Sequence, residues 1–184
     1  DLPGTIVLQS VVDEEVGGLG TRRALERGHR ADAAVVLEPT SGQLCPVEGG
    51  LEWFDLVVAG VAGHSAQRYR SIHAGGRGSA VNAIEKAHKL MAAIAEYERV
   101  RGNAAVHPLM PPGITTINPG AIIGGTGRGD GGMPSTLHAY SNMADYCRVG
   151  YSMKYLPSER GDAVKRDPEA FAAAVAATDP WLRD

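Results

Sequence analysis

The chain has 184 residues, 43% hydrophobic and 21% charged, which is the balance of an ordinary globular protein with one domain or two small ones. Its net charge of -3 gives no reason to expect a nucleic acid or an anionic membrane as partner. Two cysteines, Cys45 and Cys147, are too few for a disulfide framework and favour a reducing, cytoplasmic compartment. No apolar stretch approaches the roughly 20 residues that span a bilayer. The chain opens on Asp1 without a methionine or a signal-like segment, so we expect an excerpt of a longer parent protein.

The first part of the chain predicts one βαβ unit of a parallel sheet. Thr5–Val12 and Ala33–Leu37 are aliphatic and β-branched enough for two buried strands. Between them a short helix is expected over Arg22–Arg27, with Gly28 as its stop. Strand, helix and strand within about 35 residues is the pattern of a parallel pair with its crossover helix.

Carboxylates follow both predicted strands. Glu14 and Glu15 come directly after the first strand, and Glu38 ends the second. Because ligands gather at the carboxyl ends of strands in open α/β sheets, this placement suits a hard, oxygen-liganded metal centre with a general base beside it. Taken alone, a Glu-Glu pair is more often a solvated acidic loop or a charge that favours the start of a helix. A glutamate before proline, as at Glu38, is likewise common at strand ends.

From residue 47 onward the predicted order is strand, helix, strand, strand, helix. The longest helix signal runs from Ala80 to about Val100. A second helix is expected to begin at Pro168, and the three strands are expected over Leu51–Val61, Thr115–Ile123 (interrupted by a turn at Asn118–Gly120) and Tyr146–Leu156. This order predicts a split-βαβ, ferredoxin-like α/β sandwich that lacks its last strand.

Two glycine-rich segments are predicted to be loops. The segment 63–79 contains His64, which taken alone is as often a plain loop histidine as a functional one. The segment Gly124–Gly132 has few apolar side chains and is expected to be a mobile loop. It lacks the Gly-Lys-Ser/Thr ending of a phosphate loop, so nucleotide binding there is excluded.

Short motifs follow one another along nearly the whole chain, and they are weak singly and specific as an ordered set. They are Val12–Gly20, Ala31–Asp32, Leu37–Thr40, Gly50–Phe54, Val58–Ser65, Asn82–Ile84, Asn118–Gly120, Ile123–Gly125, Tyr155–Pro157 and Asp179–Leu182. In this order they resemble one enzyme family, the zinc amidohydrolases that include acetylornithine deacetylase, succinyl-diaminopimelate desuccinylase, aminoacylase and the carboxypeptidase G type.

The resemblance implies a catalytic α/β domain with two zinc ions, which cobalt or manganese can replace, and an inserted lid domain that forms a homodimer. In this chain, residues 1–46 would be a piece of the catalytic domain and residues 47–184 the lid. The parent is expected to cleave the amide bond of an N-acyl amino acid or peptide, as a deacetylase or desuccinylase does. Two alternatives stay open: an isolated, non-catalytic dimerisation module, and a dipeptidase or carboxypeptidase of the same family.

Carried over by position, the resemblance implies a role for four residues. Glu14 is the general base and acid, and Glu15 and Glu38 are each a ligand of one zinc. His64 is the lid histidine that reaches the partner subunit's active site and helps to stabilise the tetrahedral intermediate. Zinc lowers the pKa of bound water towards about 7, and an oxyanion donor contributes on the order of 3 kcal/mol in comparable sites.

The chain also departs from the family's pattern. The upstream His-x-Asp motif, the bridging aspartate and the C-terminal histidine of the family do not occur in it, so the fragment is expected to be inactive alone. Lys154 stands where the family often has arginine, and a lysine cannot form a bidentate carboxylate clamp. The family's lid asparagine falls on Ser141, beside Asn142, and substrate contacts there stay unassigned.

Overall fold

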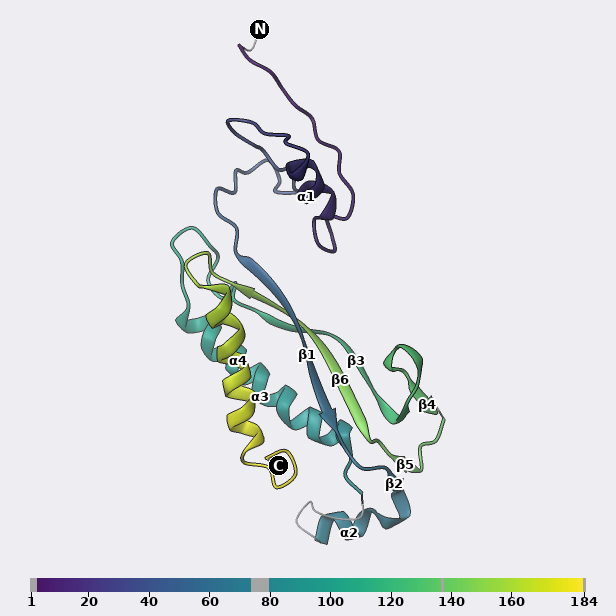
Figure 1. Cartoon of the computed structure of the whole chain (residues 1–184). Coiled ribbons are helices and arrows are strands. Elements are labelled where there is room, and N and C mark those ends of the chain that lie inside the picture. The colour runs from purple at the N-terminus through teal and green to yellow at the C-terminus, as the bar shows by residue number, and fades with distance from the viewer. Residues whose placement is uncertain (1–2, 74–79, 137, 184) are drawn as a thin grey trace. The chain divides into compact units, whose positions relative to one another are not determined.

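The computed structural model describes residues 3–73, 80–136 and 138–183, and the chain divides into two compact units, Asp1–Leu44 and Cys45–Asp184 (Figure 1). No described helix is long and apolar enough to cross a membrane. The assignment of the two units to a catalytic and a lid domain stays a prediction.

The first unit contains helix α1, Leu19–Glu26, which begins three residues before the helix predicted from the sequence. Gly28 follows it with a φ of 88°, the left-handed conformation that commonly ends a helix. Within α1, Glu26 pairs with Arg22 and Arg23 at 3.0 Å and 2.7 Å. These side chains are exposed, so the pairs contribute a few tenths of a kcal/mol at most.

The two strands predicted for this unit are not observed. The segments Thr5–Val12 and Ala33–Leu37 have no regular secondary structure, and their aliphatic side chains are exposed, with Ile6 at 81% and Leu8 at 86%. A strand of a parallel sheet needs strands beside it and helices on both faces. The described residues of this unit supply α1 alone, so the expected parallel βαβ sheet is not seen.

The second unit is built on a sheet of four strands in the order β1-β6-β3-β4. Its strands are β1 (Gly50–Ala59), β3 (Ile117–Arg128), β4 (Pro134–Thr136) and β6 (Tyr146–Tyr155), and neighbours pair antiparallel. A short ribbon joins β2 (Gly63–His64) to β5 (Asn142–Met143). Because β6 lies between β1 and β3, the strand order is that of the predicted split βαβ.

Helices α3 (Ala83–Ala104) and α4 (Gly161–Ala176) cover one face of this sheet (Figure 1). Alternate residues of β6 point at them, and the core cluster consists of Val58, Ala83, Ala87, Leu90, Ile94, Ile117, Cys147, Val149, Tyr151, Met153 and Val164. Each large aliphatic side chain buried in this way contributes about 1.5–3 kcal/mol. The residues of β1 alternate between this covered face and an exposed face of the sheet.

Helix α3 begins at Ala83, three residues after the start expected from the sequence at Ala80, and it runs to Ala104. Asn82 is its N-cap, and the side-chain oxygen accepts hydrogen bonds from the backbone N–H groups of Ile84 and Glu85 at 3.0 Å and 3.4 Å. Helix α4, by contrast, starts at Gly161 rather than at Pro168. Packing explains the difference: Val164, in the added turns, is part of the core, and this burial extends the helix across a proline that lies inside it.

The glycine-rich segment Gly124–Gly132 is wrongly predicted as a loop. Strand β3 runs through it to Arg128, a 3₁₀ turn follows over Asp130–Gly132, and the expected turn at Asn118–Gly120 is a bulge within β3. Helix α3 explains one glycine: a Cβ on Gly124 would lie 2.9 Å from Cγ1 of Ile84. Here glycine permits close packing between strand and helix.

The segment 63–79, also expected to be a loop, is regular over its described part. Strand β2 is followed by a 3₁₀ turn, Ser65–Gln67, and by helix α2, Arg68–His73. Residues 74–79 lie outside the described residues.

Candidate functional site

Glu14 and Glu15 lie in a tight turn just before α1, and both are exposed. The turn is closed by backbone hydrogen bonds, in which the carbonyl oxygen of Asp13 accepts from Gly17 and Gly18 at 3.3 Å and 2.7 Å. Asp13 has a φ of 66°, an uncommon conformation for a residue with a side chain. The turn therefore presents both carboxylates to solvent.

Glu38 lies in a second turn of the same unit and is also exposed. Its carbonyl oxygen accepts a hydrogen bond from the backbone N–H of Thr40 at 2.7 Å, and the Thr40 hydroxyl donates to the carbonyl of Gln43 at 2.7 Å. These bonds fix the backbone on the C-terminal side of Glu38 and leave its carboxylate unengaged among the described residues.

These carboxylates are chemically suited to bind a metal ion, but they are too few to form a metal site. Oxygen ligands suit a hard or borderline cation, but a catalytic zinc takes three protein ligands. No group of three or more His, Cys, Asp or Glu side chains lies close enough to hold a metal ion within the described parts of the chain. The described residues therefore do not form a metal site by themselves.

His64 belongs to the second unit, where strand pairing fixes its backbone. It lies opposite Asn142 in the β2–β5 ribbon, and the next backbone N–H, of Ser65, donates to the carbonyl of Ser141 at 2.7 Å. Its Nδ1 accepts a hydrogen bond from the backbone N–H of Ala66 at 3.1 Å. A neutral imidazole that accepts at Nδ1 carries its proton on Nε2. His64 thus presents an exposed Nε2–H donor.

The ribbon that carries His64 is tied to the main sheet through β5. The carbonyl oxygens of Met143, Ala144 and Asp145 accept from the Thr126 hydroxyl at 3.3 Å and from the backbone N–H groups of Ala83 and Gly60 at 2.9 Å and 2.7 Å. These three consecutive carbonyls hold the ribbon to β3, α3 and the end of β1. Sequence reasoning missed them because such bonds depend on tertiary placement rather than on residue type.

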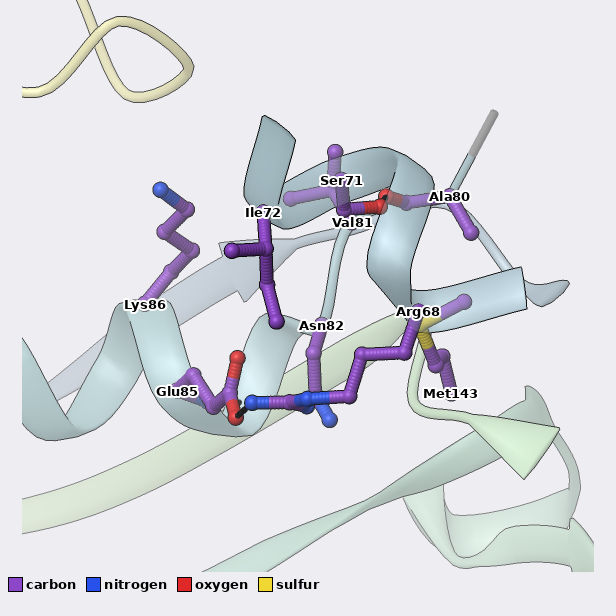
Figure 2. Close-up of a pocket in the computed structure, with 9 residues that line it drawn as sticks. All are labelled: Arg68, Ser71, Ile72, Ala80, Val81, Asn82, Glu85, Lys86 and Met143. Carbon is purple, nitrogen blue, oxygen red and sulfur yellow. Dashed lines mark hydrogen bonds and ion pairs between the residues drawn. The ribbon is translucent and has the colours of Figure 1, made fainter. Parts of the chain in front are cut away.

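A small pocket lies beside this segment, between α2, the start of α3 and Met143 of β5 (Figure 2). Arg68 crosses it to pair with Glu85, and the Ser71 hydroxyl donates to the carbonyl of Ala80 at 2.7 Å. Its volume is about 170 Å³, below the roughly 300 Å³ of common ligand sites. Since Arg68, Glu85 and Ser71 already have partners within it, the pocket joins α2 to α3 and is not a candidate substrate site.

Lys154 and the pair Ser141–Asn142 lie at different parts of the second unit. Lys154 pairs with Leu51 in the β1–β6 register, and its Nζ is 3.3 Å from Oε1 of Glu48. Asn142 faces His64 across the ribbon. The structure thus brings Asn142, and not Lys154, to the histidine.

Asp179 is a buried charge whose role the sequence did not reveal. The residue is 5% exposed. Its carboxylate accepts hydrogen bonds from Nζ of Lys86 at 2.9 Å and 3.0 Å, from Nζ of Lys89 at 3.2 Å, and from the backbone N–H groups of Trp181 and Leu182. Burial by itself raises the pKa of Asp179, but these hydrogen bonds outweigh it and hold the pKa well below its usual range. This cluster fastens the turn after α4 to α3, so it is structural.

Comparison with known proteins agrees with this architecture. Residues 68–180 match the peptidase dimerisation domain of the M20 type. The chain is 36% identical over 183 residues to a protein of Halalkalibacterium halodurans named N-formyl-4-amino-5-aminomethyl-2-methylpyrimidine deformylase, and 35% identical over 186 residues to a Bacillus subtilis protein of the same name. Each alignment takes in 100% of this chain and 40% of the relative. The chain therefore spans well under half the length of these relatives.

Proposed function

The chain belongs to the M20 peptidase family, whose dimerisation domain it carries, and on this premise we propose that it is part of a homodimeric amidohydrolase. The observation that carries the proposal is the 36% identity along the whole chain, which includes the Glu14–Glu15 turn as well as the dimerisation domain. The family expected from the motifs is confirmed. The activity of the parent is inferred from this family membership.

The proposed reaction is hydrolysis of an N-formyl amide on a small amine. Both relatives are named as deformylases of an aminomethyl-pyrimidine, which favours a formyl group over the acetyl or succinyl group expected from the sequence. In this reaction the amide C–N bond breaks, the hydroxyl of water joins the carbonyl carbon, and a proton goes to the departing nitrogen. The products are formate and the free amine.

Glu14 is proposed as the group that moves this proton. An exposed carboxylate on a turn closed by backbone hydrogen bonds can accept a proton from the attacking water and deliver it to the leaving nitrogen. His64 is proposed to donate from Nε2 to the oxyanion in the partner subunit's active site, because Nδ1 is engaged by Ala66. The hydrogen bond from Ala66 supports this role of His64, because it selects the tautomer that carries its proton on Nε2.

Glu15 and Glu38 are proposed as zinc ligands of the parent, one for each ion. The described residues do not complete a metal site, and the remaining ligands are proposed to come from other parts of the parent. Metal analysis of the parent, purified without chelator, tests this directly. Two zinc ions per subunit are expected, with fewer in Glu15→Ala and Glu38→Ala; a metal-free, active parent would contradict it.

Formate release from an N-formyl aminomethyl-pyrimidine by the full-length parent tests the function. We expect Glu14→Gln to lower kcat by about 10²–10⁴-fold, the contribution usual for a general base. Glu26→Gln is the matched control, because this glutamate is in the same unit and, among the described residues, pairs with the exposed Arg22 and Arg23. Equal activity of both variants would overturn the role of Glu14, and no turnover of any N-acyl amide would overturn the enzymatic proposal.

One observation favours the non-catalytic alternative for the isolated chain. The second unit has a packed core, whereas the first leaves its aliphatic segments exposed. As a separate polypeptide, the chain is therefore proposed to act only as a dimerisation module. Light scattering should find a dimer, and a strictly monomeric chain would count against an interface in this unit.

A further inference from the structure

Two exposed aromatic side chains, His138 and Tyr140, lie on the segment that leads from β4 back to β5. Tyr140 is 85% exposed, and its ring meets that of His138 edge to face, with the centroids 6.4 Å apart and an interplanar angle of 85°. Neither ring is part of the core cluster. A single exposed aromatic side chain is ordinary on a protein surface, so what distinguishes Tyr140 is its place in the fold.

The backbone presents Tyr140 at the tip of a tight turn. The N–H of Asn142 donates to the carbonyl of Ala139 at 2.9 Å, which closes a four-residue turn with Tyr140 and Ser141 at its centre. The carbonyl of Ser141 accepts from the N–H of the residue that follows His64, at 2.7 Å, and Asn142 pairs with His64 itself. The turn that carries Tyr140 is therefore bonded directly to the ribbon that carries His64.

The hairpin before this turn is also anchored. Strand β3 pairs with β4 and contacts β5, so the hairpin lies beside the β2–β5 ribbon (Figure 1). The N–H of Gly127 donates to Oδ1 of Asp145 at 3.0 Å, and the Tyr146 hydroxyl donates to the carbonyl of Gly132. The guanidinium of Arg128 lies 5.1 Å from the centroid of the Tyr146 ring. These contacts support the backbone on both sides of the aromatic pair, which is what a side chain needs in order to hold a ligand in one orientation.

We propose that Tyr140 binds the substrate by stacking on an aromatic ring of its amine part. This rests on the proposed function, in which His64 reaches the partner subunit's active site, because the hydrogen bonds of the turn carry Tyr140 there with it. The substrate class is then a formamide whose amine bears a flat, nitrogen-containing ring, as in the aminopyrimidine of the proposed reaction.

The geometry of the aromatic pair suits this role. The edge-to-face contact with His138 occupies at most one face of the Tyr140 ring, and the exposure of Tyr140 leaves the other face open. A flat heteroaromatic ring can stack there in an offset arrangement. Tyrosine has only two side-chain torsions, so fixing it against a ligand costs little conformational entropy.

Steady-state kinetics of the full-length parent with two substrates tests the stacking. For an N-formyl aminomethyl-pyrimidine, we expect Tyr140→Ala to raise KM by about tenfold or more and to change kcat by less than about threefold. Tyr140→Phe keeps the ring and should stay within about twofold of the natural KM. For an N-formyl alkylamine, which has no ring to stack, the KM of the alanine variant should rise by less than about threefold. An equal rise for both substrates, or equal KM values for the alanine and phenylalanine variants, would overturn the proposal.

Tyr69 provides the matched control. It is a second exposed tyrosine of the same unit, 55% exposed, and it lies on α2 rather than in the turn bonded to the ribbon. Tyr69→Ala should keep the natural KM for the pyrimidine substrate. A rise as large as that of Tyr140→Ala would show a general effect of removing a surface ring and would also overturn the proposal.

Mixed dimers of the parent test which active site Tyr140 serves. One subunit carries Tyr140→Ala and the other Glu14→Gln, and two different affinity tags isolate the mixed species. The only site with an intact Glu14 then belongs to the Tyr140→Ala subunit, so it has a tyrosine available only if Tyr140 acts across the dimer. We expect the natural KM; the raised KM of Tyr140→Ala would overturn the assignment to the partner's site.

Binding of the free aminomethyl-pyrimidine, measured by calorimetry, separates this proposal from the proposed function. A Kd about tenfold higher in Tyr140→Ala than in Tyr140→Phe, in a parent that releases no formate, supports the stacking role and counts against the deformylase. Formate release with the same Kd and KM in all variants supports the deformylase and overturns the stacking role.

Discussion

The two units use the same kind of aliphatic sequence with opposite results. Ile6, Val7 and Leu8 in the first unit are exposed, whereas Val149 and Met153 in the second are among the most buried residues of the chain. The second unit has partners for its strands: β6 is paired on both sides and packs against α3. The difference teaches that an aliphatic run gains burial energy only where neighbouring elements supply a surface to pack against.

The sharpest test of this comparison is to shorten one side chain in each unit. Met153 is 1% exposed, so Met153→Ala should lower the free energy of unfolding by about 2–5 kcal/mol. Leu8→Ala, at an exposed position, should change it by less than about 0.5 kcal/mol. Urea titration of this chain followed by circular dichroism measures both. A large loss with Leu8→Ala would mean that the first unit is packed after all.

The ion pairs of the second unit are likewise expected to contribute more to stability than those of the first unit. Asp179→Asn leaves Lys86 and Lys89 without their buried partner and should cost about 1–3 kcal/mol of stability. Glu26→Gln removes exposed pairs of α1 and should cost less than about 0.5 kcal/mol. Thermal unfolding of both variants checks the contrast, and equal shifts in Tm would remove it.

The pH dependence of stability follows from the lowered pKa of Asp179. A carboxyl group whose pKa is lower in the folded than in the unfolded state stabilises the fold above its unfolded pKa, near 3.9, and loses that effect as the pH falls towards its folded pKa. The stability difference between the natural chain and Asp179→Asn should therefore be constant from pH 8 to about pH 5 and shrink below about pH 4. A difference that grows in acid would contradict the assignment.

The helix caps provide the smallest test. Asn82→Ala removes the side-chain acceptor for two N–H groups at the start of α3 and should cost about 1 kcal/mol. Asn82→Asp is the control, since it keeps an acceptor at this position. Helix α1 has no side-chain cap at Gly18 and so has nothing comparable to lose. Urea midpoints of the two variants should differ, and identical midpoints would show that the cap contributes nothing.

Local signals predicted much of the second unit. Strands β1, β3 and β6 and the long helix α3 were expected within a few residues of where they lie. The predictions that failed did so because of contacts between residues that are far apart in the sequence. Gly124 is read locally as loop, yet β6 and Ile84 hold it in a strand, and Pro168 is read as a helix start, yet burial of Val164 extends α4 before it.

The sequence predicted which residue types belong to the candidate site, but it did not predict their contacts in the folded chain. Nothing in the sequence told that Nδ1 of His64 is occupied by the N–H of Ala66, because this contact depends on the 3₁₀ turn after β2. The proposed roles of Glu14, Glu15 and Glu38 stay predictions, since their turns can be placed from sequence but ligands contributed from elsewhere cannot. Asp179 was visible only as part of a motif, and its lysine partners come from a distant helix.

The glycines of β3 also decide how this protein can vary over evolutionary time. At Gly124 a Cβ would lie 2.9 Å from Cγ1 of Ile84 and 3.2 Å from Sγ of Cys147, so alanine there would force these side chains to shift. At Gly120 the nearest atoms are 3.9 Å from a built Cβ, so alanine would fit. We therefore expect natural variants to differ at Gly120 and to keep glycine at Gly124. The two glycines lie in the same strand but tolerate substitution to different degrees.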